Sequence, residues 1–227
     1  AIIAYYIADN GELVKVTNSY YDAATGTLVF KVSHFSQYAV GYAPITFSDT
    51  SSSFAKSYIT YLAARNMING TAEGQFSPNA QITRADFTLI LARMAGAKLD
   101  GYKASSFRDV KADSYYAQSV GWASENGLTS GVSEGVFAPA VNISREQMVT
   151  MIARFAALQK LSLPQALPAS AFADAAEIPA FAVDAAKTLQ QAGIISGKSG
   201  NRFAPKDVAL REEAAKMLGM LLQQIIK

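Results

Sequence analysis

The feature that most constrains this chain is a motif that occurs three times with fixed internal spacing. A glycine closes the stretches MING, LTSG and IISG, and a phenylalanine, a proline and an arginine follow it at offsets of 6, 8 and 14 residues. The glycines are Gly70, Gly131 and Gly197, and the arginines are Arg84, Arg145 and Arg211. An internal repeat of this length predicts three copies of one small structural unit.

Each unit also has a constant upstream part. An aromatic residue precedes each glycine by 16 positions, and a Phe-x-Asp triplet precedes the aromatic. The aromatics are Phe54, Tyr115 and Phe181, and the aspartates are Asp49, Asp109 and Asp174. Apolar residues then recur with helical spacing, which predicts first helices over about residues 54–66, 115–126 and 181–192. Asn66, Gly127 and Gly193 are suited to the left-handed cap that ends a helix.

A second helix is predicted to begin at each arginine. Thr83 with Asp86 resembles an N-cap box and Ser144 with Gln147 fits the S-x-x-Q pattern, whereas Leu210 cannot cap. A cation in the first turn has the wrong sign for the positive end of the helix dipole. Its threefold recurrence therefore indicates a small anion site, in which the guanidinium adds its donors to the unpaired N–H groups of the helix start.

Residues 1–44 have a different texture. They alternate as strands do, with turn residues at Asp9-Asn10-Gly11 and Thr25-Gly26, which predicts strands over residues 2–8, 13–22 and 27–42. Three strands do not make a stable sandwich alone. We interpret this segment as the last strands of a larger upstream β domain, or as a small sheet that leans on the downstream part of the chain. His34 has no histidine or acidic cluster nearby and is interpreted as structural.

Composition narrows the function classes. The chain has 227 residues, of which half are hydrophobic, and its 20 basic and 18 acidic residues are spread along it. This distribution lacks the basic stripe that nucleic-acid binding needs. No apolar run reaches the length of a bilayer span, so no membrane insertion is expected. The absence of cysteine excludes disulfides, thiolate metal sites and thiol catalysis.

The sequence offers little for an enzyme. It contains no G-x-S-x-G elbow, no phosphate-binding glycine loop, no H-E-x-x-H motif and a single histidine, so we expect no catalytic residues, no metal and no cofactor. A glycosidase with paired carboxylates stays open, because aspartate and glutamate are plentiful. A purely structural or protein-interaction helical repeat module is a further alternative.

The three units resemble S-layer homology (SLH) repeats, which have a Phe-x-Asp start, an aromatic-led helix, a Gly-Ile-Ile-x-Gly turn, a Phe-x-Pro loop and a Thr-Arg-Ala-Glu helix start. The resemblance implies a mainly α fold in which three repeats form a pseudo-threefold, three-pronged spindle after a short antiparallel β segment. HFSQYAVG is similar to the closing strand of β domains that precede such repeats. The expected boundaries are 1–44 for the C-terminal strands of the upstream domain and 45–104, 105–169 and 170–227 for the repeats.

The resemblance also implies a function and a place. SLH trios anchor surface proteins non-covalently at the cell wall or S-layer of Gram-positive-type bacteria. They do so by binding secondary cell wall polysaccharide, in particular a terminal N-acetylmannosamine that carries a pyruvate ketal, in grooves between repeats. On this chain the implied contacts are the arginines to the ketal carboxylate, the aspartates to sugar hydroxyls or to the position of the groove, and the glycines where backbone approaches the ligand. The aromatics Phe54, Tyr115 and Phe181 are candidates to stack on a sugar ring.

Two alternatives for these residues stay open. The aromatics could pack in the core instead, and the arginines could pair with the aspartates across repeat interfaces in a buried ion-pair network. The family usually has tryptophan at the aromatic position, whereas Trp122 lies further along the first helix of repeat two and is assigned to the core. Because Leu210 leaves repeat three without a capping side chain, we expect the grooves that depend on repeat three to bind weakest or to serve structure only.

Overall fold

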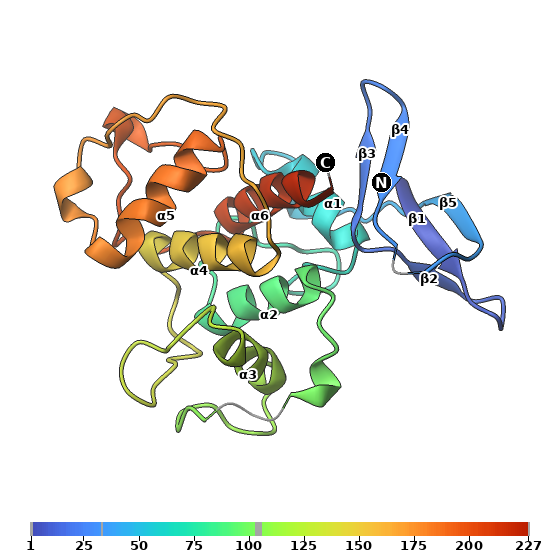
Figure 1. Cartoon of the computed structure of the whole chain (residues 1–227), viewed down its shortest axis with the longest axis horizontal. Helices are drawn as coiled ribbons and strands as arrows, with labels where there is room; N and C mark the ends of the chain where they lie inside the picture. Colours follow the sequence, from blue (N-terminus) through green and yellow to red (C-terminus); the bar gives the residue numbers. More distant parts are fainter. Residues whose placement is uncertain (1, 33, 103–105, 227) are drawn as a thin grey trace.

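The computed structural model describes residues 2–32, 34–102 and 106–226 (Figure 1). Within these residues a small β segment is followed by three pairs of α-helices. The strands are β1 (Ile2–Ile7), β2 (Leu13–Lys15), β3 (Ser19–Asp22), β4 (Thr27–Phe30) and β5 (Tyr38–Tyr42). The helices are α1 (Lys56–Ala64), α2 (Arg84–Met94), α3 (Ala117–Glu125), α4 (Arg145–Leu158), α5 (Ala180–Gln191) and α6 (Arg211–Ile226).

The first helix of each repeat lies close to its predicted place. α1 and α3 begin two residues after Phe54 and Tyr115, so these two aromatics lie in the turn before the helix. Phe181 lies inside α5, because Pro179 in extended conformation serves as the N-cap and the helix begins directly after it. The predicted left-handed ends are confirmed, with φ of 58° at Asn66 and 72° at both Gly127 and Gly193.

The β segment is more broken than predicted. The two long strands expected over 13–22 and 27–42 each divide in two, which gives an antiparallel sheet of order β2-β1-β5 and a separate β3-β4 hairpin. The chain bends between β2 and β3, where the Ser19 hydroxyl donates to the Val16 carbonyl at 2.8 Å. The turns are placed as predicted, with positive φ at Gly11 and Gly26.

The β segment leans on repeat one through a fully buried arginine. Arg65 follows α1 and donates from Nε to the Ser19 carbonyl at 2.7 Å and from Nη2 to the Ile2 carbonyl at 3.1 Å. Its guanidinium stacks 3.9 Å from the centroid of the Tyr61 ring, whose hydroxyl also donates to Ser19. The His34 ring packs edge-on against the Tyr6 ring, with 4.9 Å between the ring centroids, which agrees with the structural role expected for it.

The three repeats close into a ring. The first helix of each repeat packs on the arginine helix of the repeat before it, so that α3 lies on α2 and α5 lies on α4. The same relation joins the last repeat to the first, because α1 packs on α6 (Figure 1). The predicted fold, a pseudo-threefold assembly of three repeats after a short antiparallel β segment, is confirmed.

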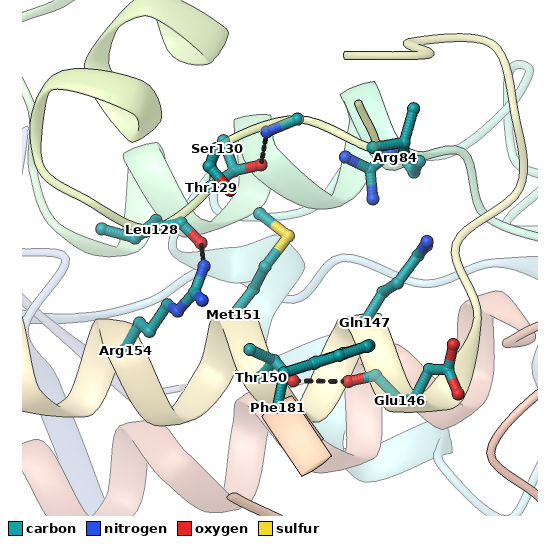
Figure 2. Close-up of a pocket in the computed structure, with 12 residues that line it drawn as sticks. Arg84, Leu128, Thr129, Ser130, Glu146, Gln147, Thr150, Met151, Arg154 and Phe181 are labelled. Atoms are coloured by element: carbon teal, nitrogen blue, oxygen red, sulfur yellow. Dashed lines mark hydrogen bonds between the residues drawn. The ribbon is translucent and has the colours of Figure 1, made fainter. Parts of the chain in front are cut away.

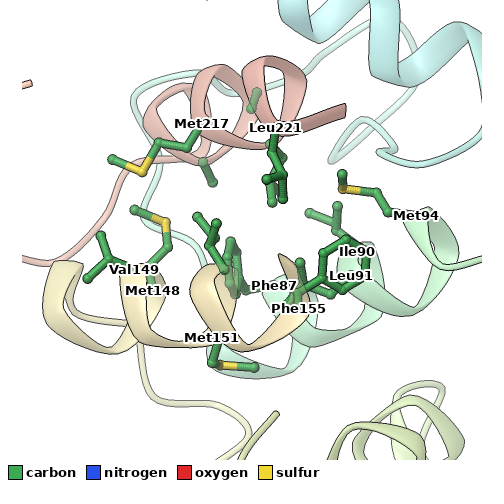
Figure 3. Packing of buried hydrophobic residues seen from close by; sticks show 14 of the residues in the cluster. Phe87, Ile90, Leu91, Met94, Met148, Val149, Met151, Phe155, Met217 and Leu221 are labelled. Carbon is green, nitrogen blue, oxygen red and sulfur yellow. The ribbon is translucent and has the colours of Figure 1, made fainter. Parts of the chain in front are cut away.

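Among the described residues, the larger of two apolar clusters is shared by all three repeats. Phe87 from α2, Phe155 from α4 and Leu221 from α6 are each fully buried and converge at the centre (Figure 3). Burying a side chain of this size stabilises the fold by roughly 1.5–3 kcal/mol. Trp122 is 3% exposed and belongs to this cluster, as predicted.

A triangle of backbone hydrogen bonds joins the strand-like residues that precede the arginine helices. Ile82 N–H donates to the Ala209 carbonyl, Ala209 N–H donates to Ile143, and Ile143 N–H donates back to Ile82, at 3.1, 2.9 and 3.0 Å. Each repeat thus gives one bond and receives one, so none of the three is a terminal unit.

Candidate functional site

The Phe-x-Asp aspartates hold the Phe-x-Pro loop of their own repeat. The Asp174 carboxylate accepts from Phe203 N–H at 2.7 Å and from Ala204 N–H at 2.8 Å, and both N–H groups are buried. Asp49 accepts in the same way from Phe76 and Ser77, and Asp109 from Phe137 and Ala138. This geometry favours the positioning role for the aspartates over direct contact with a sugar.

These hydrogen bonds also set the acidity of the aspartates. The Phe76 N–H group is the main cause that lowers the pKa of Asp49 below its ordinary value. At Asp109 and Asp174 burial is the largest single effect and would raise the pKa, but the donated N–H groups, together with the charges of Arg108 and Arg202, outweigh it and the pKa is lowered. All three carboxylates are therefore stabilised in the charged form.

The turn glycines are required by close packing. A Cβ at Gly131 would lie 2.8 Å from the ring of Phe107 and would overlap the Val136 carbonyl. A Cβ at Gly70 would likewise lie 2.9 Å from the ring of Phe47. In repeats one and two the glycine thus lets the turn close over the first phenylalanine, whereas a Cβ at Gly197 would meet Asn201. Gly131 and Gly197 also line the grooves described below.

Each repeated arginine reaches across to the next repeat. Nε of Arg84 donates to the Phe137 carbonyl at 2.8 Å, and the guanidinium lies 4.7 Å from the centroid of the same phenylalanine ring. Arg145 makes the same contacts with Phe203, and Arg211 closes the circle with Phe76. The three side chains are 3%, 3% and 8% exposed in chain order.

The helix starts are not available to an anion in the way that the sequence suggested. Arg84 N–H donates to the Val141 carbonyl at 2.9 Å and Ala85 N–H to the Pro139 carbonyl at 3.1 Å. The first N–H groups of α4 and α6 are used equivalently by the next repeat. The prediction that unpaired N–H groups at the helix start complete an anion site is therefore wrong, and any anion must be bound by the guanidinium and by other groups of the groove.

The ion-pair alternative is also wrong in its original form. Among the described residues, none of the three arginines lies within 4.0 Å of a Phe-x-Asp carboxylate. The aspartates act at longer range: burial lowers the pKa of Arg84 to about 10, and the charge of Asp109 opposes that shift. The arginines do join the repeats, but they do so through backbone carbonyls.

The capping pattern is as predicted. Thr83 accepts from Asp86 N–H at 3.1 Å, and Ser144 forms a complete capping box with Gln147. In repeat three only the reciprocal half of the box is made, in which Leu210 N–H donates to Glu213 Oε2 at 2.9 Å.

The Arg84 groove is built from all three repeats (Figure 2). It has a volume of about 370 Å³ and is lined by Arg84 of repeat one, by residues 128–132 and one face of α4 of repeat two, and by Phe181 of repeat three. The Phe181 side chain is 55% exposed. Within the described residues, Arg84 Nη2 is buried without a hydrogen-bond partner.

The Arg145 groove repeats this plan one repeat further on. It has a volume of about 100 Å³ and is lined by Arg145, by residues 194–198, by α6 and by Phe54 of repeat one. Phe54 is 59% exposed, and Lys216 Nζ lies 5.7 Å from the centroid of its ring. The same arrangement places a sugar-sized platform beside a buried guanidinium.

The third position of the plan, around Arg211 and Tyr115, contains hydrogen bonds between its own groups. Tyr115 donates from its hydroxyl to Asp86 Oδ1 at 2.7 Å, and Arg211 Nη2 donates to the Asn69 carbonyl at 2.7 Å. Tyr115 is still 68% exposed. The alternative that the three aromatics are core residues is therefore wrong, because each of them has more than half of its surface in solvent, and Phe54 and Phe181 line grooves.

Sequence reasoning missed Arg154, which also lines the Arg84 groove and donates to the Leu128 carbonyl at 3.2 Å. The signal was present: Arg154 follows Arg145 at the same offset as Arg93 follows Arg84, while repeat three has Met220 there. Thr129 and the groove face of α4 were missed because no repeated motif marks them.

Three helical repeats closed into a ring, with a buried arginine and an exposed aromatic at each junction, define a pseudo-threefold module of the closed helical-repeat class. The S-layer homology domain model matches residues 46–88, 106–149 and 171–215, and the chain belongs to that family. Domains of this family are non-catalytic modules that anchor surface proteins, such as S-layer proteins and glycoside hydrolases, to the cell wall.

Relatives of both kinds are found. The chain is 33% identical over 89% of its length to amylopullulanase of Thermoanaerobacterium thermosulfurigenes and 31% identical over 79% to exoglucanase XynX of Acetivibrio thermocellus. It is 26% identical over 89% to S-layer protein sap of Bacillus anthracis. The chain spans only 11%, 16% and 24% of these three proteins.

Two further properties of the described residues concern membrane-spanning helices and metal ligands. No α-helix of the described residues has the length and apolar character that crossing a membrane requires. In the same part of the chain, no group of three or more histidine, aspartate or glutamate side chains is placed to hold a metal ion.

Proposed function

We propose that this chain anchors a secreted surface protein to the cell wall of a Gram-positive-type bacterium by binding secondary cell wall polysaccharide in its inter-repeat grooves. The ligand we propose is a terminal N-acetylmannosamine that carries a pyruvate ketal. The observation that carries this proposal is the Arg84 groove, where the buried guanidinium keeps Nη2 without a partner beside a cavity of about 370 Å³ and an exposed aromatic ring.

The chemistry of the groove suits such a ligand. A buried, unpaired donor of a charged group costs free energy, and a carboxylate that accepts from it recovers that cost. The apolar face of a sugar ring can stack on Phe181, while the Thr129 and Ser130 hydroxyls and the Gln147 amide offer polar partners to hydroxyl and acetamido groups. In this proposal the glycines and the aspartates shape the groove.

The remaining assignments extend the proposal. Arg145 with Phe54 and Arg211 with Tyr115 are the corresponding sites at the other two repeat junctions. We keep residues 1–44 as the end of a β domain and the repeat boundaries as predicted, although the boundary at residues 104 and 105 lies outside the described residues. Relatives named as hydrolases and as S-layer proteins support an anchoring role that is shared by proteins of different activity.

Calorimetric titration tests the role of the carboxylate. We expect pyruvylated N-acetylmannosamine to bind and the same sugar without its ketal to bind at least tenfold more weakly, because one charge-assisted hydrogen bond contributes about 1.5–3 kcal/mol. Equal affinity for the two sugars would remove the carboxylate from the mechanism.

Truncating the aromatic platform tests the groove itself. Phe181→Ala should weaken binding of the pyruvylated sugar about five- to tenfold, since it removes stacking of about 1 kcal/mol. The melting temperature should stay within a degree or two, because the ring is 55% exposed. Val183→Ala is the matched control, since Val183 is also exposed on α5 but does not line the groove. A similar loss in both variants would argue against binding in this groove.

We place any hydrolase activity of the full-length protein outside this chain. Purified chain incubated with wall polysaccharide should bind it and release no reducing sugar. Release of sugar that persists through further purification would contradict this assignment.

A further inference from the structure

The Arg84 groove is longer than the single sugar that the proposed function places in it. One side of the groove is a stripe of α4 in which Gln147, Thr150, Met151 and Arg154 recur with helical spacing. At about 1.5 Å of rise per residue, the stripe from Gln147 to Arg154 is about 10 Å long, which exceeds the length of one pyranose ring. A terminal sugar with its carboxylate at Arg84 therefore leaves the far end of the groove unfilled.

A second arginine lies at that far end. Figure 2 shows Arg154 and Arg84 well apart, with Met151 between them. Nη1 of Arg154 donates to the Leu128 carbonyl at 3.2 Å, which holds the exposed guanidinium at the turn of repeat two. A guanidinium has five N–H donors, so most donors of Arg154 remain for a ligand.

Arg154 is not paired with an acidic group of the protein. In the part of the chain that the structure describes, no carboxylate oxygen lies within 4.0 Å of its guanidinium. Glu146 lines the same groove, but its Oε1 is already paired with Lys206 Nζ at 2.8 Å. The groove thus has an arginine without a paired carboxylate at each end.

The equivalent positions of the other repeats differ. In repeat three Met220 replaces the arginine and packs against the larger apolar cluster, and the Arg145 groove has about 100 Å³ against about 370 Å³ in the Arg84 groove. In repeat one Arg93 is partly buried; burial lowers its pKa, and the charge of Asp86 opposes that shift. The combination of a long groove and a second unpaired arginine therefore belongs to the Arg84 groove.

We propose that Arg154 forms a second anion subsite, so that the Arg84 groove recognises an acidic oligosaccharide whose second sugar also carries a carboxylate. The anion at Arg84 rests on the proposed function, whereas the subsite at Arg154 rests on the length of the α4 stripe and on the unpaired guanidinium. The terminal sugar lies at Arg84 and Phe181, and the second sugar lies along α4 towards Leu128. Because an ion pair at an exposed arginine is weak, Arg154 selects among ligands more than it raises affinity.

Two disaccharides that differ in one carboxylate test the subsite by calorimetric titration of the full chain. In both, the terminal sugar is pyruvylated N-acetylmannosamine; the second sugar is glucuronic acid in one probe and glucose in the other. The glucuronic acid probe should bind about three- to fivefold more tightly at low ionic strength, as expected for an exposed ion pair. This difference should disappear in Arg154→Gln and persist in part in Arg154→Lys.

Arg108→Gln is the matched control. Arg108 is also exposed and also donates from Nη1 to a backbone carbonyl, that of Glu134 at 3.3 Å, but it does not line the groove. The control should keep the full difference between the two probes. Equal affinity of the original chain for both probes, or a difference that survives in Arg154→Gln, would overturn the second subsite.

A probe without the ketal separates this inference from the proposed function. Digalacturonic acid carries a carboxylate on each of two neighbouring sugars, and its dimethyl ester carries none. In arginine side-chain NMR the acid should shift the guanidinium signals of both Arg84 and Arg154, and the ester should shift neither. If the acid does so and the pyruvylated probes do not bind, the second subsite stands and the proposed ligand is wrong. If the pyruvylated probes bind equally and the acid leaves Arg154 unshifted, the proposed ligand stands and the second subsite is wrong.

Discussion

At the scale of single residues, the repeated motif contains two groups of residues, one with contacts inside its own repeat and one with contacts to other repeats. The aspartate and the glycine of each repeat shape the Phe-x-Pro loop and the turn beside it, so the contacts that explain them stay within one repeat. The arginine and the aromatic act between repeats, where the arginine joins two of them and the aromatic stands at the groove of a third. The two groups are therefore distinguished by whether their contacts stay within one repeat or reach another.

The aspartates make stability depend on acidity. Their pKa values are lowered in the folded state, so the stabilisation they provide is complete above the ordinary value of 3.8 and is lost as the pH falls through the lower folded-state pKa. The melting temperature should therefore be constant down to about pH 4 and fall steeply below it. Thermal melts between pH 6 and 2.5 check this, and a flat profile would contradict it.

Asp174→Asn isolates one of these loops. It should lower the free energy of unfolding at pH 7 by about 2 kcal/mol, because an amide presents one acceptor oxygen to two buried N–H groups. It should also make the acid limb of the pH profile shallower. The matched control, Asp184→Asn on the exposed face of α5, should change neither quantity.

At the scale of elements, the arginine helices tolerate a cation in the first turn because their first N–H groups are not open to solvent. Carbonyls of the next repeat accept from them, and the cap satisfies a further donor. The N-cap therefore matters more than the sign of the first residue.

Removing the N-cap side chain of α4 tests the capping assignment through the free energy of unfolding. Ser144→Ala should lower the free energy of unfolding by about 1 kcal/mol, since it removes the acceptor of the Gln147 N–H group. In contrast, Ser124→Ala inside α3 should be neutral or slightly stabilising, because alanine is the better helix former. Chemical denaturation of both variants measures the difference, and equal effects would count against the capping assignment.

The sequence was informative about elements wherever local chemistry decides them. Asn66 and Gly127 ended helices as predicted because only a few residue types adopt positive φ at low cost. One continuous strand was predicted over 13–22, but the chain bends before Ser19. That bend depends on Arg65 at the end of α1, and residues 13–22 contain no local signal such as a glycine or proline.

At the scale of the whole molecule, the resemblance implied a pseudo-threefold fold, but the sequence did not reveal which contacts close the ring. The spacing of Arg84 predicted a helix start, but nothing in it indicated that Phe137 O and Val141 O would be the acceptors of the next repeat. Tertiary contacts of this kind decide whether the N–H groups of a helix terminus are free to bind a ligand or are used to join two repeats. For the same reason the exposure of Phe54 and the hydrogen bond between Tyr115 and Asp86 became visible only in three dimensions.

A closed ring should unfold as one unit. Deletion of repeat three, residues 170–227, removes the donors to the Phe76, Pro78 and Ala80 carbonyls and leaves α1 without α6. In open repeat arrays the remaining units stay folded, since each contacts only its neighbours. Here we expect fragment 1–169 to lose its cooperative melt, as monitored by circular dichroism. A sharp transition within a few degrees of the full chain would show that the ring is not required.

The buried contact between Arg65 and the β segment has a mechanical consequence. Arg65 binds the carbonyls of Ile2 and Ser19, so tension on the chain ahead of the repeats is passed to α1 at two points before the segment up to residue 44 can be stretched. α1 in turn lies against α6 of the last repeat. A force applied to the chain ahead of the repeats is therefore distributed over the first and last repeats together. We expect the grooves to be strained at the same time and not to open one after another.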